Sequence, residues 1–131
     1  MKILVTGAHG QLGSNIAEVF AGRADVVALT RSDLDLADSS AVERTIASHR
    51  PDVVINCAAF NDVEAAEDRA MEAIQINALA VRAMARGAAS AGACLVHYGT
   101  DFVFDGLQAD RPYIETDPPA PQSVYGASKL L

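Results

Sequence analysis

Residues 2–13 read KILVTGAHGQLG, an apolar run followed by glycines at positions 7, 10 and 13. The run Lys2–Thr6 is short and rich in β-branched residues, which is typical of a buried strand. From Gln11 to Ala21 apolar residues recur at helical spacing, and Gly22 is a suitable terminator for that helix. The stretch therefore predicts a strand, a tight glycine turn and a helix in direct succession.

Glycines placed between a strand and a helix suit the binding of a pyrophosphate. They permit a tight turn, let phosphates approach the backbone, and let the helix pack against the strand. The first turn of the helix adds free N–H groups and a partial positive charge. We therefore expect a dinucleotide site formed by Gly7, Gly10, Gln11, Leu12 and Gly13. The spacing G-x-x-G-x-x-G is one residue longer at the front than the general fingerprint, and an ordinary glycine-rich connection is the alternative.

The rest of the chain continues the alternation of strands and helices. Strands are predicted over residues 25–30, 52–57 and 93–98, with a short additional one over 32–36. One helix is expected to begin at Ser40, with Glu43 completing a capping box, and to end near Arg50. A long helix is expected over 62–91, with a candidate break near Asp68, and a last one from Ser123 onward. Residues 99–121 hold four of the five prolines and are predicted to form an ordered loop.

Continuous apolar strands separated by helices predict an α/β fold with a parallel sheet covered on both faces. We expect a Rossmann-type, doubly wound domain that binds NAD(P) and spans residues 1–131. The last helix ends after about two turns on the apolar pair Leu130-Leu131. We therefore expect the domain to be truncated before a C-terminal, substrate-binding part.

Composition excludes several classes of partner. The 131 residues carry 10 basic and 17 acidic side chains, a net charge of −7, so no nucleic acid is expected to bind. No apolar run approaches the roughly 18–20 residues of a membrane span, and no signal peptide precedes the first strand, so we expect a cytoplasmic protein without a membrane partner. The two cysteines form no disulfide framework. His9, His49 and His97 lack the spacing of metal ligands, so no metal site is expected and these histidines are assigned no role.

The end of the second strand bears on the choice of nucleotide. NAD sites usually carry an acidic residue there, which binds the ribose hydroxyls. This sequence has Thr30-Arg31-Ser32, and an arginine suits a 2′-phosphate, so NADPH is favoured over NADH. A solvated loop arginine is the alternative. Asp35 and Leu36 are placed either to flank an adenine ring or to form a plain turn.

Tyr125 and Lys129 are four residues apart on the last predicted helix and therefore share one face of it. A nearby cation stabilises a phenolate and so favours a tyrosine as general acid. Thr100 follows a strand at the carboxyl edge of the sheet, where its hydroxyl either donates to a substrate carbonyl or bonds the local backbone. Asn77 lies inside an apolar helical segment, which indicates a buried polar role.

These segments together resemble the extended branch of the short-chain dehydrogenase/reductase superfamily, which acts on nucleotide sugars. The segment HYGTDFVFDG, residues 97–106, is similar to the HYSTDYVFDG-type stretch of dTDP-4-dehydrorhamnose reductases. Residues 10–13, 50–56, 115–117 and 124–126 resemble the same family, so the match runs along the whole chain. The family is longer than this chain, and its C-terminal part completes the sugar-nucleotide pocket. The chain departs from the family at Gly99, Phe102 and Phe60-Asn61.

The resemblance implies NAD(P)H-dependent reduction of the 4-keto group of a nucleotide-linked deoxysugar, from dTDP-4-dehydrorhamnose to dTDP-rhamnose. Tyr125 would protonate the C4 oxygen, while Lys129 would tune Tyr125 and hold the nicotinamide ribose. Thr100 would bind the carbonyl, Asp101 would lie close to the sugar, and Asn77 would support the proton relay. The residues that would line the nicotinamide side are Ala59, Phe60 and Asn61.

Three alternatives to this reductase stay open. An epimerase or a dehydratase of the same superfamily would share the fold, and so would a binding protein that has lost catalysis. A third alternative is that these 131 residues bind a dinucleotide without turning over a substrate. Related enzymes often dimerise through helices that correspond to residues 69–91 and 123 onward, so a homodimer is expected for a full-length protein.

Overall fold

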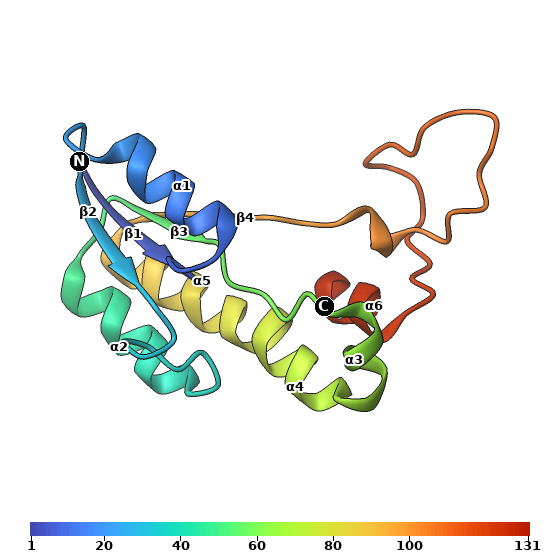
Figure 1. Ribbon diagram of the computed structural model, residues 1–131, viewed down its shortest axis with the longest axis horizontal. Coiled ribbons are helices and arrows are strands. Elements are labelled where there is room, and N and C mark those ends of the chain that lie inside the picture. The colour runs from blue at the N-terminus through green and yellow to red at the C-terminus, as the bar shows by residue number, and fades with distance from the viewer.

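Four parallel strands form the centre of the computed structural model, which describes all 131 residues (Figure 1). Their order across the sheet is β2-β1-β3-β4. The bounds are β1 Lys2–Thr6, β2 Asp25–Leu29, β3 Val53–Asn56 and β4 Cys94–His97. Because all strands run the same way, their carboxyl ends meet at one edge of the sheet. The predicted parallel sheet is confirmed.

Helices cover both faces of this sheet, although unequally. Helices α2, Ser39–His49, and α5, Ala80–Ala91, pack on one face, where Leu4 and Val54 are fully buried. Helix α1, Gln11–Phe20, covers the other face over β1 and β2, against Ile3 and Val5. That face stays partly open over β4, where Val96 is 38% exposed. The Rossmann-type α/β arrangement is therefore present, with thinner cover at the β4 edge.

The predicted short strand over 32–36 is wrong, because these residues form turns. The carboxylate of Asp33 accepts hydrogen bonds from the backbone N–H of Thr30 at 2.9 Å and from its hydroxyl at 2.6 Å. This turn directs the chain back over the sheet, and Leu34 becomes part of the core at 5% exposure. The alternation of polar and apolar residues here reflects one buried side chain in a turn.

The start of α2 also differs from the prediction. Its N-cap is Asp38, whose carboxylate accepts from the backbone N–H of Ala41 at 2.9 Å. The predicted capping box of Ser40 and Glu43 is therefore wrong, since the aspartate two residues earlier already caps the helix. Glu43 instead forms an ion pair with Arg86 of α5 at 3.7 Å.

The long predicted helix over 62–91 consists of four pieces. They are α3 Val63–Asp68, α4 Ala70–Ile74, a π-helical turn η1 Gln75–Leu79, and α5, which ends at Gly92 in the left-handed conformation. The break falls at Arg69, with φ −122° and ψ 41°, next to the predicted position. The π-helical turn was not predicted, and such turns are frequent at functional sites.

The last segment carries a loop and one more helix. A 3₁₀ turn η2, Asp101–Val103, precedes the proline-rich loop, which projects from the body of the molecule in Figure 1. Helix α6, Val124–Leu130, follows, and the Ser123 hydroxyl accepts from the Gly126 N–H at 3.0 Å, as the predicted cap requires. No helix in the structure combines the length and apolar character needed to cross a membrane.

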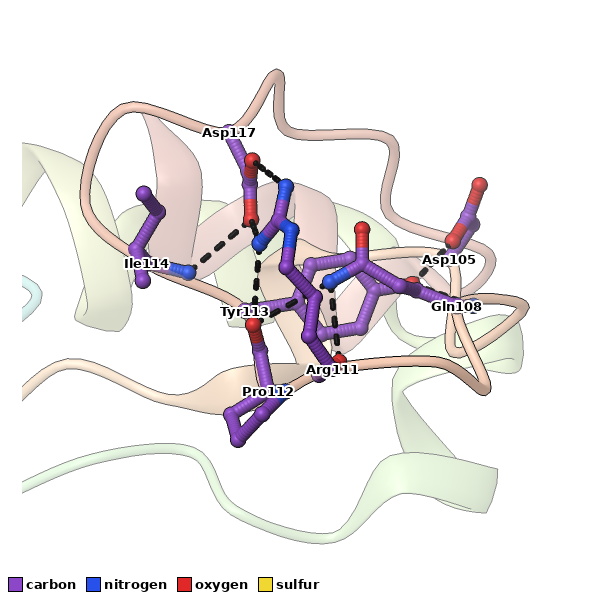
Figure 2. Close-up of polar contacts among 7 residues, drawn as sticks. All are labelled: Asp105, Gln108, Arg111, Pro112, Tyr113, Ile114 and Asp117. Atoms are coloured by element: carbon purple, nitrogen blue, oxygen red, sulfur yellow. Dashed lines mark hydrogen bonds and ion pairs between the residues drawn. The ribbon is translucent and has the colours of Figure 1, made fainter.

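Side chains rather than regular structure order the proline-rich loop (Figure 2). The Arg111 guanidinium donates to both carboxylate oxygens of Asp117, at 2.8 and 2.7 Å. Asp117 also accepts from the Ile114 N–H at 2.9 Å. The Tyr113 ring stacks on Phe104 with 4.4 Å between centroids, and its hydroxyl donates to Asp105. The segment is therefore the ordered loop that the sequence predicted.

Candidate functional site

The glycine turn brings the backbone of two strands into close contact. Gly7 has φ +68°, which favours glycine, and a Cβ atom there would lie 2.8 Å from the Ala58 backbone nitrogen. A Cβ atom at Gly13 would overlap the carbonyl oxygen of Gly7. The turn after β1 therefore packs against the end of β3 and against the start of α1 only because these positions lack side chains.

The amino end of α1 faces the solvent beside this turn and can accept an anion. Gly10 is its N-cap and offers no side-chain acceptor, so the first backbone N–H groups of the helix have no side-chain partner. Gln11 is exposed, and Leu12 is 42% exposed although it is apolar. Free N–H groups at a helix amino end, with the helix dipole behind them, suit a pyrophosphate.

A cavity of about 340 Å³ adjoins the turn at the carboxyl ends of β1, β2 and β3. This volume lies within the range of small-molecule sites. The cavity brings together seven of the residues predicted to bind a cofactor, namely Gly7, Thr30, Arg31, Asp35, Leu36, Ala59 and Phe60. The other turn residues, Gly10–Gly13, and Asn61 are not part of its lining. Most of the predicted cofactor residues therefore lie in the cavity or in the adjoining glycine turn, whereas Asn61 and the α6 residues Tyr125 and Lys129 lie in neither.

Arg31 is the unpaired cation at the rim of this cavity. Its side chain is exposed and takes part in none of the three ion pairs of the structure. Thr30, by contrast, is engaged within its own turn, and its hydrogen bonds to Asp33 lower the pKa of that carboxyl group. Glu72 also lines the cavity but is paired with Arg69 at 2.6 Å. Arg31 is thus the free positive charge available to a ligand there.

Asn77 connects three segments from inside the π-helical turn. Its side-chain oxygen accepts from the Phe60 N–H at 2.8 Å, and its amide nitrogen donates to the Phe60 carbonyl at 2.9 Å. The same nitrogen donates to the Ser128 hydroxyl of α6, also at 2.9 Å. Asn77 is 4% exposed, so the predicted buried polar role is confirmed as a clamp between the segment after β3 and α6.

Helix α6 approaches η2 more closely than a side chain would allow. A Cβ atom at Gly126 would overlap the carbonyl oxygen of Phe102. The neighbouring ring of Tyr125 packs edge-on against Phe102, with 5.6 Å between centroids. No group of the chain forms a hydrogen bond with the Tyr125 hydroxyl, so this hydroxyl is free for a ligand. Beyond the motif itself, no pattern of neighbouring residues indicated that position 126 must lack a side chain.

Lys129 lies on the same helix as Tyr125 and contacts the end of β4. Its Nζ donates to the Tyr98 carbonyl at 2.7 Å and lies 3.2 Å from Nε2 of His97. Burial lowers the pKa of Lys129. Burial, followed by the charge of Lys129, also lowers the pKa of His97. No role was predicted for His97. However, β1, β3 and β4 each end in a polar residue, and this shared feature could have indicated that the three residues lie together at the carboxyl edge of the sheet.

Thr100 begins the 3₁₀ turn η2 as its N-cap. Its hydroxyl accepts from the Phe102 N–H at 3.3 Å and lies 3.4 Å from the Asp101 carboxylate. Of the two roles predicted for the Thr100 hydroxyl, a bond to the local backbone and a bond to a substrate carbonyl, the first is therefore present. Asp101 is exposed and lines a second, shallow hollow with Phe102, Phe104, Asp105, Gly106, Gln122 and Ser123. Thr100, Tyr125 and Lys129 thus lie around the contact between η2, β4 and α6.

Comparison with known proteins identifies the family. Residues 1–131 match the family described as RmlD substrate binding domain. The chain is 47% identical to a dTDP-4-dehydrorhamnose reductase of Burkholderia thailandensis over all of its length and 44% of that protein. A solved structure of such a reductase from Clostridium acetobutylicum has a TM-score of 0.94, at 43% identity, over 99% of this chain and 46% of that one.

A second solved structure carries a nucleotide. The dTDP-4-dehydrorhamnose reductase of Bacillus anthracis in complex with NADP has a TM-score of 0.90, at 38% identity, over 98% of this chain and 46% of that one. The chain therefore spans less than half the length of the relatives that it matches. The resemblance inferred from residues 97–106 and the other matching segments is confirmed. Because the family match covers residues 1–131 without a gap at either end, the chain belongs to the RmlD substrate binding domain family.

Proposed function

We propose that this chain forms the dinucleotide-binding part of an NAD(P)H-dependent reductase, with NADPH favoured. The substrate class that we propose is a nucleotide-linked 4-keto deoxysugar, with dTDP-4-dehydrorhamnose as the first compound to test. The observation that carries the proposal is the shared edge of the sheet, where the glycine turn and cavity adjoin the segment holding Tyr125 and Lys129. The identity to reductases of this name supports it.

The residues of the cavity fit a dinucleotide. Positions 7 and 13 accept no Cβ atom because the turn packs closely against the end of β3 and the start of α1. Such a tight glycine turn before a helix suits a pyrophosphate. Arg31 would bind a 2′-phosphate, Asp35 and Leu36 would flank the adenine, and Ala59, Phe60 and Asn61 would face the nicotinamide side. The nicotinamide, when bound, would supply a hydride to C4 of the sugar.

The groups of α6 and η2 would handle the proton. The free Tyr125 hydroxyl would donate to the developing oxyanion at C4, and the Thr100 hydroxyl would turn from Asp101 to the same oxygen. Asp101 would contact the sugar. Lys129 would stabilise the phenolate and hold a ribose hydroxyl, while Asn77 would keep α6 and the segment at Phe60 in register. General acid catalysis of this kind typically contributes 10²–10⁴-fold to the rate.

We propose further that the 131 residues alone bind the nucleotide without turnover. The relatives are more than twice as long as this chain, so a large part of their substrate pocket lies outside the family match. An assay of turnover therefore needs a protein that carries this chain at the length of its relatives.

Substitution of Tyr125 by Phe in such a protein tests the proposal. We expect Tyr125→Phe to lower turnover of dTDP-4-dehydrorhamnose at least about a hundredfold with an unchanged dissociation constant for NADPH. The matched control is Tyr98→Phe, because the exposed Tyr98 contributes only its backbone carbonyl to the site. Near-normal turnover in Tyr125→Phe would remove Tyr125 as the acid, and absence of turnover in the unaltered protein would remove the proposed substrate class.

A further inference from the structure

A row of polar side chains crosses the carboxyl edge of the sheet and ends at Lys129. Thr6, Asn56 and His97 are the last residues of β1, β3 and β4 and are register partners across the sheet. The Thr6 hydroxyl donates to Oδ1 of Asn56 at 2.7 Å, and Nδ2 of Asn56 lies 3.1 Å from Nδ1 of His97. Nε2 of His97 then lies 3.2 Å from Nζ of Lys129. The row therefore joins the base of the glycine turn to the lysine of α6.

A backbone group fixes the orientation of the Asn56 amide. The N–H of Ala58 donates to Oδ1 of Asn56 at 3.1 Å, and a backbone N–H can only donate. A rotated amide would place its own NH₂ group against this N–H, at a residue that is 2% exposed. The oxygen of Asn56 therefore faces Ala58 and Thr6, and the NH₂ group faces His97.

The amide orientation in turn fixes the tautomer of His97. Nδ1 of His97 must accept the hydrogen bond from Asn56, so the proton of the neutral ring is on Nε2. That N–H is directed at Nζ of Lys129. An ammonium group has only donors, whereas a neutral amine has a lone pair that accepts this bond. The neutral amine also donates to the Tyr98 carbonyl, so it satisfies every contact at this position.

No negative charge offsets this preference. Lys129 takes part in no ion pair, and its nitrogen contacts only His97 and the Tyr98 carbonyl. The acidic residues on the helices and 3₁₀ turn packed against α6 are Glu64, Glu67, Asp68, Glu72 and Asp101. Of these, Glu67 accepts from the Val124 N–H, Glu72 pairs with Arg69, and Asp101 lies beside the Thr100 hydroxyl. The other ionisable group on the same face of α6 is Tyr125.

We propose that His97 is a positioning residue that holds Lys129 as a readily deprotonated amine, with Asn56 fixing the ring proton that faces it. Burial of both groups acts in the same direction, because it lowers the pKa of Lys129 and that of His97. The consequence for catalysis rests on the proposed reductase function. Lysine and tyrosine have ordinary pKa values of about 10.4 and 10. In its ammonium form Lys129 would stabilise the Tyr125 phenolate, and because its pKa is lowered it could pass a proton to that phenolate and become the amine that the His97 N–H stabilises.

The chain allows a direct test, because Lys2 and Lys129 are its only lysines. Lysine labelled with ¹³C gives two titrating NMR signals in the folded, ligand-free chain, and Lys2 serves as the internal reference. In His97→Gln the side-chain oxygen of glutamine can accept a hydrogen bond from the Lys129 ammonium, whereas Nε2–H of His97 could only donate to Lys129. We therefore expect the pKa of Lys129 to rise by about one unit, which is tenfold in proton affinity. In His97→Asn the shorter side chain removes the contact, and we expect a smaller rise.

A measurement on the unaltered chain covers the case in which these variants fail to fold. Labelling of histidine with ¹⁵N distinguishes the two ring tautomers, and we expect the proton of His97 on Nε2. A proton on Nδ1, or a Lys129 signal unmoved in both folded variants, overturns the inference. Because these readouts need no substrate, they are independent of the Tyr125 test. If the protein does not reduce the proposed sugar, the inference about His97 still stands. If the His97 proton is found on Nδ1, the proposed reductase function still stands.

Discussion

The glycine turn at residues 7–13 and helix α6 reach the same edge of the sheet by different physical means. The turn is held by backbone packed against backbone, since Cβ atoms at Gly7 or Gly13 would collide with main-chain atoms. Helix α6 is held mainly by side chains, through Asn77 to Ser128 and through Lys129 to the end of β4. The turn depends on the absence of side chains, whereas α6 depends on the identity of its side chains as well as on the missing side chain at Gly126, where a Cβ atom would overlap the Phe102 carbonyl.

This difference separates the substitutions that each half tolerates. A Cβ atom at Gly7 or Gly13 disrupts the turn, whereas polar changes on the surface of α1 leave it intact. At α6 a side chain at Gly126 is excluded in the same way. The other contacts of α6 depend on matched donors and acceptors, because a buried polar group that loses its partner costs free energy. Three substitutions distinguish the two halves, and a fourth, of smaller expected effect, concerns the proline-rich loop.

Substitution of Gly13 by Ala gives the largest expected effect. The added Cβ atom overlaps the Gly7 carbonyl, which is backbone and cannot move aside, so we expect the free energy of unfolding to fall by about 3 kcal/mol. The control is Gly99→Ala, because a Cβ atom at Gly99 meets nothing within 4 Å. Urea denaturation measures both. Equal stability of the two variants would mean that the turn does not depend on this contact.

Substitution of Asn77 by Ala tests the side-chain half. It removes three hydrogen bonds and leaves the part-buried backbone N–H and carbonyl of Phe60 without these partners, so we expect a loss of about 2 kcal/mol in unfolding free energy. Asn15→Ala, at an exposed position of α1, is expected to change it by less than about 0.5 kcal/mol. A loss at Asn77 as small as that of the control would show that α6 is held by packing alone.

Substitution of Arg31 by Ala changes a side chain at the cavity beside the glycine turn, in the half of the site that is otherwise built from backbone. We expect the affinity for NADPH to fall about tenfold, or about 1.4 kcal/mol, with the affinity for NADH unchanged. Arg23→Ala removes the same charge from an exposed position outside the cavity and is expected to leave both affinities unchanged. Calorimetric titration measures all four values. A parallel loss for both nucleotides would exclude selective binding of a 2′-phosphate by Arg31.

The proline-rich loop provides the smallest expected effect. Hydrogen bonds from Arg111 lower the pKa of Asp117 to about 2. The charged carboxylate therefore orders the loop fully above its ordinary pKa near 4, and this order is lost as the pH falls toward 2. In Asp117→Asn we expect faster hydrogen exchange at the Ile114 N–H at neutral pH, with an unchanged urea midpoint. Unchanged exchange at Ile114 would mean that the ion pair does not order the loop.

Much of the fold could be predicted because local patterns determine it. The apolar runs at β1, β2, β3 and β4 and the helix stop at Gly92 are visible in neighbouring residues, and so is the cap at Ser123. The cavity residues after β1, β2 and β3 followed from the rule that ligands bind at the carboxyl edge of such sheets. The break beside Asp68 was visible as a weakness in the helical pattern.

What could not be predicted depends on contacts between distant residues. His97 and Asn56 are 41 positions apart and meet only because β3 and β4 pair in one particular register. The close approach of Gly126 to the Phe102 carbonyl, which leaves no room for a Cβ atom, depends on how α6 docks against η2. At residues 32–36 the alternating pattern indicated a strand, but the hydrogen bonds from Thr30 to Asp33 stabilise a turn instead.

Binding of NADPH to the chain, followed residue by residue, decides whether the glycine turn and the cavity hold a dinucleotide. NMR amide shifts during a titration report both the affinity and the place of binding. The structure predicts saturable binding that perturbs residues 7–13, Arg31, Leu36 and Phe60, with the larger shifts for NADPH than for NADH near Arg31. Absence of binding at millimolar NADPH, or shifts confined to the hollow at residues 101–106, would contradict the account.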